Sequence, residues 1–259
     1  MTQPLVLSPR ECRGKTWHPP RDLGCAADQA LLPLHAGELA KAAAAMPLAV
    51  VKQSREWRLV GVCGLEPGHN LFIRQGQWLG HYQPQWLATY PFEIVSVGEK
   101  SLVTFDQDSG LLGAKGQADD VKAEPFFDDQ EQMTRAVAGR VEALKAAHQK
   151  HLATQKALSA LAGAGVLAPW PEALRRQLGI AHDGLYCIDE PALAKLSDAA
   201  FLELRRAQAL PLAYAVNVSL TQSHLLARLE RMNPAQAEHP ESLDSLFGDE
   251  DDELSFEFD

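Results

Sequence analysis

The sequence has few of the features that mark exported, membrane-spanning or disulfide-linked proteins. Its four cysteines, Cys12, Cys25, Cys63 and Cys187, form no C-x-x-C pair, which indicates reduced thiols and neither a zinc ribbon nor a redox motif. The start lacks the charged-then-apolar order of a signal peptide, and the longest apolar stretch, residues 210–216, is far shorter than the roughly 20 residues that cross a bilayer. We therefore expect a cytoplasmic protein without a transmembrane segment.

Basic charge is also scarce. The chain has 24 Lys and Arg against 34 Asp and Glu, which gives a net charge of -10. Nine of the acids and no base lie in residues 241–259, which leaves 25 acids against 24 bases in residues 1–240. Because neither a basic domain nor a basic arm is present, we expect no direct binding of nucleic acid. An acidic tail indicates solvation or a basic partner.

The usual fingerprints of catalysis are missing as well. The sequence contains no G-x-S-x-G, no P-loop and no dinucleotide-binding glycine pattern. Glycines at 61, 64, 68, 76 and 80 lie between β-like runs instead of opening a helix, so they predict turns. We expect no cofactor, and the sequence favours a non-enzymatic role without deciding the question.

What is present is a hydrophobic pattern whose period changes along the chain. Apolar residues make up 46% of the sequence, enough for a sizeable core. Residues 48–105 hold short β-like runs separated by glycine-containing turns, the spacing of an antiparallel meander in a small, curved sheet or partial barrel. Helical spacing extends from about residue 130 to 162, with shorter helices expected at 39–45, after Ser197 and at 219–231.

These patterns predict an α+β fold. A curved, antiparallel, β-rich half with an extended N-terminal arm (residues 1–115) packs with an α-helical half (116–232) as one integrated domain. Residues 233–259 combine low hydrophobicity with high charge, which predicts a disordered acidic tail.

An aromatic string marks residues 78–92, which hold two of the five Trp and two of the four Tyr. Trp78, Tyr82, Trp86 and Tyr90 recur every four residues, although Pro84 opposes a continuous helix. The four rings have two interpretations: they join the sheet to its neighbours as core wedges, or they line a pocket or peptide groove and bind a ligand.

A second candidate site combines histidine and glutamate. His35 and Glu38 have the H-x-x-E spacing that places an imidazole and a carboxylate on one helical face, and His69 and His81 could complete a metal shell. This set is the basis of an alternative hypothesis, a metal-dependent oxygenase or hydrolase. Pro33 opposes a regular helix through His35, so a chance arrangement is the stronger interpretation.

His148 and His151 form a further pair on the long predicted helix. Their spacing of i and i+3 can bring two metal ligands together. Leu144 and Leu152 lie along the same side, which favours a semi-buried helix boundary.

The acidic tail contains apolar residues that a purely solvating segment would not need. They are Phe247, Leu254, Phe256 and Phe258. Their presence predicts a docking peptide that becomes ordered when it binds another protein with a basic-rimmed apolar groove. Plain solvation and imitation of nucleic acid in a partner's basic site are the alternatives.

Several short segments, taken in order, carry a family resemblance. They are PLHAGEL at 33–39, PLAVV at 47–51, NLFI at 70–73, GQW at 76–78, YQP at 82–84, YPF at 90–92, DQDS at 106–109, FFDD at 126–129 and GLYCIDE at 184–190. Their order and spacing are similar to those of the bacterial SapC family over about residues 4–226.

The resemblance implies an accessory role. The family is named for association with a bacterial surface layer, and its genes often neighbour those for TonB-dependent receptors and flavin-dependent halogenase-like proteins. Membership implies a link to surface-layer, uptake or peptide-modification systems. It gives no role to the acidic tail, which looks like an addition, and no oligomeric state is predicted.

Overall fold

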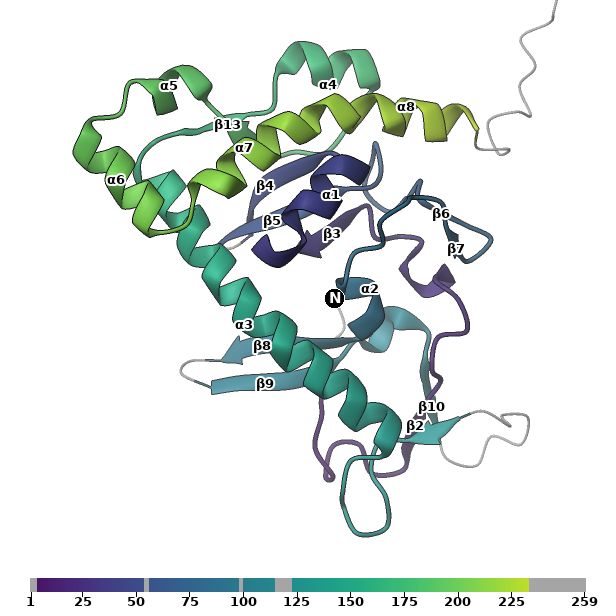
Figure 1. Ribbon diagram of the computed structural model, residues 1–259. Coiled ribbons are helices and arrows are strands. Elements are labelled where there is room, and N and C mark those ends of the chain that lie inside the picture. Colours follow the sequence, from purple (N-terminus) through teal and green to yellow (C-terminus); the bar gives the residue numbers. More distant parts are fainter. Residues whose placement is uncertain (1–3, 54–55, 98–99, 115–122, 233–259) are drawn as a thin grey trace, which may run out of the picture.

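The computed structural model describes residues 4–53, 56–97, 100–114 and 123–232 (Figure 1). Helices and antiparallel sheets occur together, which confirms the predicted α+β fold. The predicted tail at 233–259 lies outside the described residues.

The largest sheet has five strands, all paired antiparallel. Their order is β12 (Leu167–Pro169), β13 (Leu185–Ile188), β4 (Leu48–Gln53), β5 (Glu56–Val62) and β3 (Leu31–Leu34). The β4–β5 hairpin supplies the centre, and each of its strands has a continuous buried run, residues 48–50 in β4 and 59–62 in β5. Strands from distant parts of the chain complete the two sides.

Three smaller sheets hold the other strands. They consist of β1 (Leu5–Val6), β9 (Lys100–Phe105) and β8 (Phe92–Val97); of β10 (Leu112–Ala114), β2 (Lys15–Trp17) and β11 (Glu124–Pro125); and of β6 (Ile73–Arg74) with β7 (Gln77–Trp78). The predicted single meander is therefore wrong in its connectivity. Pro84 and Pro91 flank the break between β7 and β8, and a proline has no N–H to donate to a strand partner.

Helices surround these sheets. Their bounds are α1 (Leu39–Ala45), α2 (Trp86–Thr89), α3 (Arg135–Gly163), α4 (Glu172–Leu178), α5 (Glu190–Ala194), α6 (Asp198–Arg206), α7 (Leu210–Ser219) and α8 (Ser223–Arg231), with short 3-10 turns at Gly24–Ala26, Ala36–Glu38, Gln107–Ser109 and Leu220–Gln222. The predicted helix at 39–45 is confirmed, and so is the cap at Ser197, whose hydroxyl accepts the Ala200 N–H at 3.3 Å. Within the described ranges, no helix combines the length and the hydrophobicity needed to cross a membrane.

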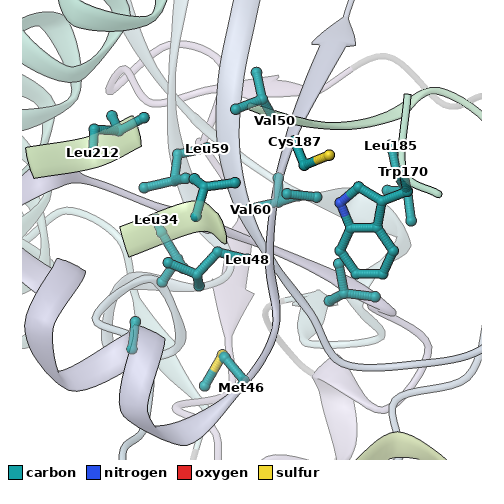
Figure 2. Packing of buried hydrophobic residues seen from close by; sticks show 14 of the residues in the cluster. Leu34, Met46, Leu48, Val50, Leu59, Val60, Trp170, Leu185, Cys187 and Leu212 are labelled. Carbon is teal, nitrogen blue, oxygen red and sulfur yellow. The ribbon is translucent and has the colours of Figure 1, made fainter. Parts of the chain in front are cut away.

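The buried residues form two separate hydrophobic cores. The larger core lies between the five-stranded sheet and its helices, where Leu48, Leu59 and Leu212 are fully buried and α7 packs on β4 and β13 (Figure 2). The smaller core is aromatic. Trp17 packs edge to face on Phe92, with ring centroids 5.1 Å apart, and the same core holds two further rings, Phe105 and Phe126. Each core takes residues from both sides of position 115, so neither sequence half has a core of its own.

Helix α3 joins the two cores, and Figure 1 shows it crossing the molecule past β5, β8 and β2. Its first turns place Val137, Val141 and Leu144 in the aromatic core, and its last turns place Leu158 and Leu161 in the larger one. Between positions 144 and 154 no side chain of this helix is fully buried. The middle of α3 therefore lies where the cores separate.

We expect Gly64→Ala to destabilise the protein by about 2 kcal/mol or more, because an added Cβ would lie 1.9 Å from the His69 carbonyl oxygen, a backbone atom. Gly139→Ala on α3 is the matched control, since nothing lies within 4 Å of its Cβ position, and it should stabilise by roughly 0.5–1 kcal/mol. Urea unfolding of both variants measures the difference. Equal stability of the two variants would contradict the close approach of the His69 carbonyl oxygen to Gly64.

Candidate binding site

A cavity of about 140 Å³ lies beside the middle of α3, between the two cores. Its apolar wall comes from four elements, β3, α2, β8 and α3, and consists of Pro33, Leu34, Trp86, Phe92, Ile94, Leu144 and Ala147. Its polar lining consists of His35, Glu38, Arg58, Gln85, Thr89, Glu93, His148 and His151. The cavity therefore combines an apolar wall with ionisable side chains, as ligand pockets do.

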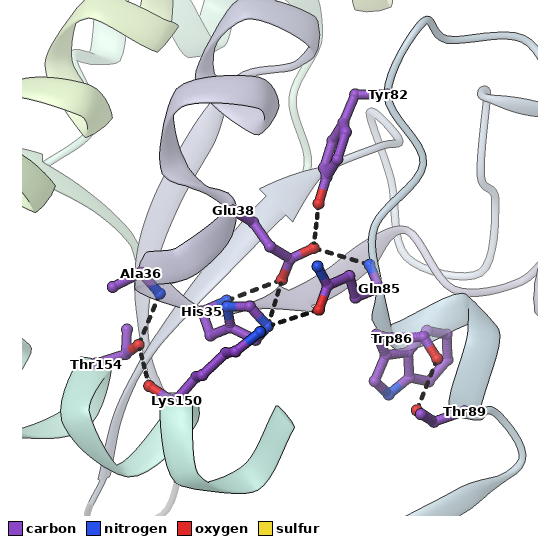
Figure 3. A network of polar contacts seen from close by, with 9 residues as sticks. All are labelled: His35, Ala36, Glu38, Tyr82, Gln85, Trp86, Thr89, Lys150 and Thr154. Carbon is purple, nitrogen blue, oxygen red and sulfur yellow. Dashed lines mark hydrogen bonds and ion pairs between the residues drawn. The ribbon is translucent and has the colours of Figure 1, made fainter. Parts of the chain in front are cut away.

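The Glu38 carboxylate organises one side of this cavity (Figure 3). Glu38 is only 2% exposed, and its Oε2 accepts the Tyr82 hydroxyl at 2.6 Å and the Gln85 backbone N–H at 2.8 Å. Its Oε1 accepts the His35 backbone N–H at 3.2 Å. Three donors offset the cost of burying the Glu38 carboxylate, and their hydrogen bonds tie residues 82–85 to the turn at 35–38.

His35 lies inside the same network, and its side chain is 5% exposed. Its Nε2 lies 3.1 Å from Gln85 Oε1 and 3.5 Å from Glu38 Oε1. A carboxylate oxygen only accepts hydrogen bonds, so Nε2 carries the proton. The other ring nitrogen, Nδ1, is buried without a hydrogen-bond partner among the described residues.

Tyr82 and Tyr90 both serve as donors. Burial and the Glu38 carboxylate raise the pKa of the Tyr82 hydroxyl, which keeps the proton on the oxygen. Burial and Asp106 raise the pKa of Tyr90 in the same way, and its hydroxyl donates to Asp106 Oδ2 at 2.9 Å. Each tyrosine therefore fixes a carboxylate in place.

The four aromatic residues proposed as ligand contacts have different surroundings. Trp78 stacks on Phe72, with ring centroids 5.0 Å apart, and its Nε1 donates to the Tyr82 carbonyl at 2.7 Å. Trp86 packs against Tyr90 at 4.7 Å and, alone among the four, lines the cavity. Pro84 and the short α2 prevent the continuous helix that would have aligned all four rings.

Of the four residues proposed as metal ligands, likewise only some line the cavity. His35 and Glu38 line the cavity together, whereas the half-buried His69 and the exposed His81 do not. In the part of the chain that the structure describes, no group of three or more His, Cys, Asp or Glu side chains is arranged to hold a metal ion. The four-residue metal site stays a prediction, and both oxygens of Glu38 already accept hydrogen bonds.

Basic groups from β5 and α3 also line the cavity. Arg58 has a buried Nε without a hydrogen-bond partner, and its guanidinium lies 3.7 Å from the Glu56 carboxylate. Burial first, and then the positive charges of Arg58 and His148, lower the pKa of His151. His151 is therefore neutral at pH 7, next to a permanent cation.

The sequence indicated some of these residues and not others. His35, Glu38, Trp86 and the pair of histidines on α3 were singled out by spacing or composition. Arg58 and Gln85 were not, because a basic residue in a strand and a glutamine beside a proline resemble ordinary surface positions. Only the packing of β5 and α2 against α3 brings them to the cavity. The proposed tail contacts Phe247, Leu254, Phe256 and Phe258 lie outside the described residues.

Comparison with known proteins gives one match. The SapC family model matches residues 7–226, most of the chain, so the chain belongs to the SapC family. No curated protein and no solved structure matches the chain.

We expect Tyr82→Phe to destabilise the protein by about 1.5–3 kcal/mol, because it removes a hydrogen bond to a buried charged group. The control is Tyr214→Phe, which changes a side chain on α7 in a residue that is 51% exposed and should shift stability by less than about 0.5 kcal/mol. Urea unfolding followed by circular dichroism gives both values. If both variants had the same free energy of unfolding, burial of the Glu38 carboxylate would not depend on the hydrogen bond from the Tyr82 hydroxyl.

Proposed function

We propose that this SapC-family protein is a non-enzymatic accessory protein that holds a small ligand in the cavity beside α3 and docks a partner protein through its acidic tail. One observation carries the first part. Two polar atoms of cavity-lining residues, Nδ1 of His35 and Nε of Arg58, are buried without a hydrogen-bond partner in the described structure. Buried polar atoms normally have partners, and a ligand bound beside Arg58 would supply an acceptor for its Nε–H.

The lining groups suit binding more than turnover. The Glu38 carboxylate, a group that serves as a base when it is free, is held by three donors, and the raised pKa of Tyr82 keeps that hydroxyl from acting as an acid near neutral pH. The alternative, a metal-dependent oxygenase or hydrolase that uses His35, Glu38, His69 and His81, requires two residues that lie outside the cavity.

The composition of the tail supports the second part of the proposal. Residues 241–259 contain nine acids, no base and six large apolar side chains, those of Leu243, Leu246, Phe247, Leu254, Phe256 and Phe258. Such a segment gains binding energy from burying its apolar side chains and selects a basic rim by charge. Surface-layer, uptake and peptide-modification systems are the settings that family membership suggests for the partner.

Ala147→Phe should abolish retention of the ligand, because the added ring fills a cavity of about 140 Å³ to which Ala147 contributes a wall. The test equilibrates the purified protein with a small-molecule extract of the native cells, releases the bound compounds by denaturation and identifies them by mass spectrometry. At least one compound should be enriched on the unchanged protein and lost from the variant.

The matched control is Ala146→Phe, which places the same ring at the neighbouring, exposed position of α3. It should retain the compound. Thermal unfolding of both variants checks that the fold is intact. Identical compounds on all three proteins would reject the cavity as the binding site.

Deleting residues 241–259 should remove one or more proteins from an affinity capture with the native lysate, because the deleted segment holds all the apolar residues proposed to dock. The control keeps the segment and replaces Phe247, Phe256 and Phe258 by serine, which preserves its charge. Loss of the partner in both variants supports docking through apolar contacts, whereas loss in the deletion alone favours charge. A charge-dependent partner displaced by DNA would support imitation of nucleic acid instead, and identical captures would reject tail docking.

A further inference from the structure

We propose that the ligand of this cavity is a small monoanion, a carboxylate attached to an apolar chain, whose acidic group lies between Arg58, His148 and His151. The inference rests on the proposed function, since it names the class of ligand for the same cavity. It follows from the charges around the cavity and from a second hollow beside it.

The charge argument begins with the basic side chains. Arg58 from β5 and His148 and His151 from α3 line one cavity. The groups that act electrostatically on His151 are Arg58, His148 and His35, which oppose its protonation, and Glu56, which favours it. An anion placed among these groups would relieve the repulsion and accept hydrogen bonds.

The acidic residues of the cavity compete only weakly with such an anion for the basic groups. The Glu38 carboxylate is buried, and its two oxygens already accept hydrogen bonds from three donors. The other acidic lining residue, Glu93, interacts with Arg58, but burial of its carboxyl and the nearby Asp106 raise its pKa, which weakens it as a competing anion. With Arg58 as its one permanent cation, the site matches a single negative charge better than a doubly charged phosphate.

A neighbouring hollow provides space for an apolar chain. It has a volume of about 330 Å³ and shares two lining residues, Ile94 and His148, with the cavity. Its other lining residues are Ser101, Val103, Lys145, Gln149 and Leu152, and Leu152 is 45% exposed. A chain that runs from the basic residues past His148 would cover Leu152 and bury apolar surface.

The test uses three probes with the same chain and different head groups: octanoate, 1-octanol and octylammonium, each below its micelle concentration. Isothermal titration calorimetry of the full-length protein at pH 7 should give an affinity for octanoate at least tenfold higher than for 1-octanol, and the weakest binding for octylammonium. Arg58→Gln should lower the affinity for octanoate by about tenfold to a hundredfold, which is the range expected for loss of a charge-assisted hydrogen bond. The affinity for 1-octanol should stay unchanged. Arg176→Gln, at an exposed side chain of α4, is the matched control and should change neither.

The pH dependence provides an independent readout. The anion stabilises protonated His151, so binding takes up a proton, and the affinity for octanoate should rise as the pH falls from about 8 to about 5.5 while the affinity for 1-octanol stays constant. His151→Gln should reduce this dependence, and His224→Gln, at an exposed position of α8, should preserve it. Proton NMR of the imidazoles should show the pKa of His151 rising when octanoate is added.

Three results would overturn the inference. One is equal affinity for octanoate and 1-octanol, with binding of both lost in Ala147→Phe; the cavity would then bind ligands without a preference for anions. Octanoate binding that is unchanged by Ala147→Phe would place the anion elsewhere. Failure of octanoate to bind would reject this ligand class, and the extract experiment would still decide separately whether the cavity holds any ligand.

Discussion

The buried carboxylate of Glu38 is the interaction on which the candidate site depends. It joins the end of β3 to the loop that follows β7, because donors from His35, Tyr82 and Gln85 converge on its two oxygens. A carboxylate buried without donors would cost several kcal/mol, so these segments must meet for the fold to tolerate Glu38 at all. The same contacts position Trp86 at the cavity wall and hold the His35 ring beside it.

Helix α3 sets the other side of the site. A second anchor fixes the helix to the network, since the Thr154 hydroxyl accepts the Ala36 backbone N–H at 2.8 Å. Its two ends are buried in different cores, and the stretch between them carries His148 and His151 at the cavity. The cavity is thus a consequence of joining two cores with one long helix whose middle turns are polar. Ionisable groups there are partly desolvated without being sealed in, a setting that favours reversible binding.

Much of the local structure was predictable from the sequence. The hairpin of β4 and β5, the helix at 39–45, the long α3 and the cap at Ser197 follow from periodicity, turn glycines and capping residues. The assembly of the sheets was not, because β3 and β13 are recruited to the β4–β5 hairpin from distant positions by packing that no local pattern encodes. For the same reason the aromatic repeat at 78–90 identified Trp86 at the cavity together with three rings that serve other contacts.

The sequence by itself determined the α+β class, about half of the described helices, the SapC-family membership and the charge asymmetry between body and tail, because these depend on local pattern, on ordered motifs and on composition. Tertiary structure alone decided that the Glu38 carboxylate holds residues 82–85 to the turn at 35–38, that His69 and His81 do not line the cavity with His35, and that Arg58 does line it with the histidines of α3. Those outcomes depend on distances between residues far apart in the chain. The chemistry of an ionisable group follows from the donors, charges and solvent that folding places around it.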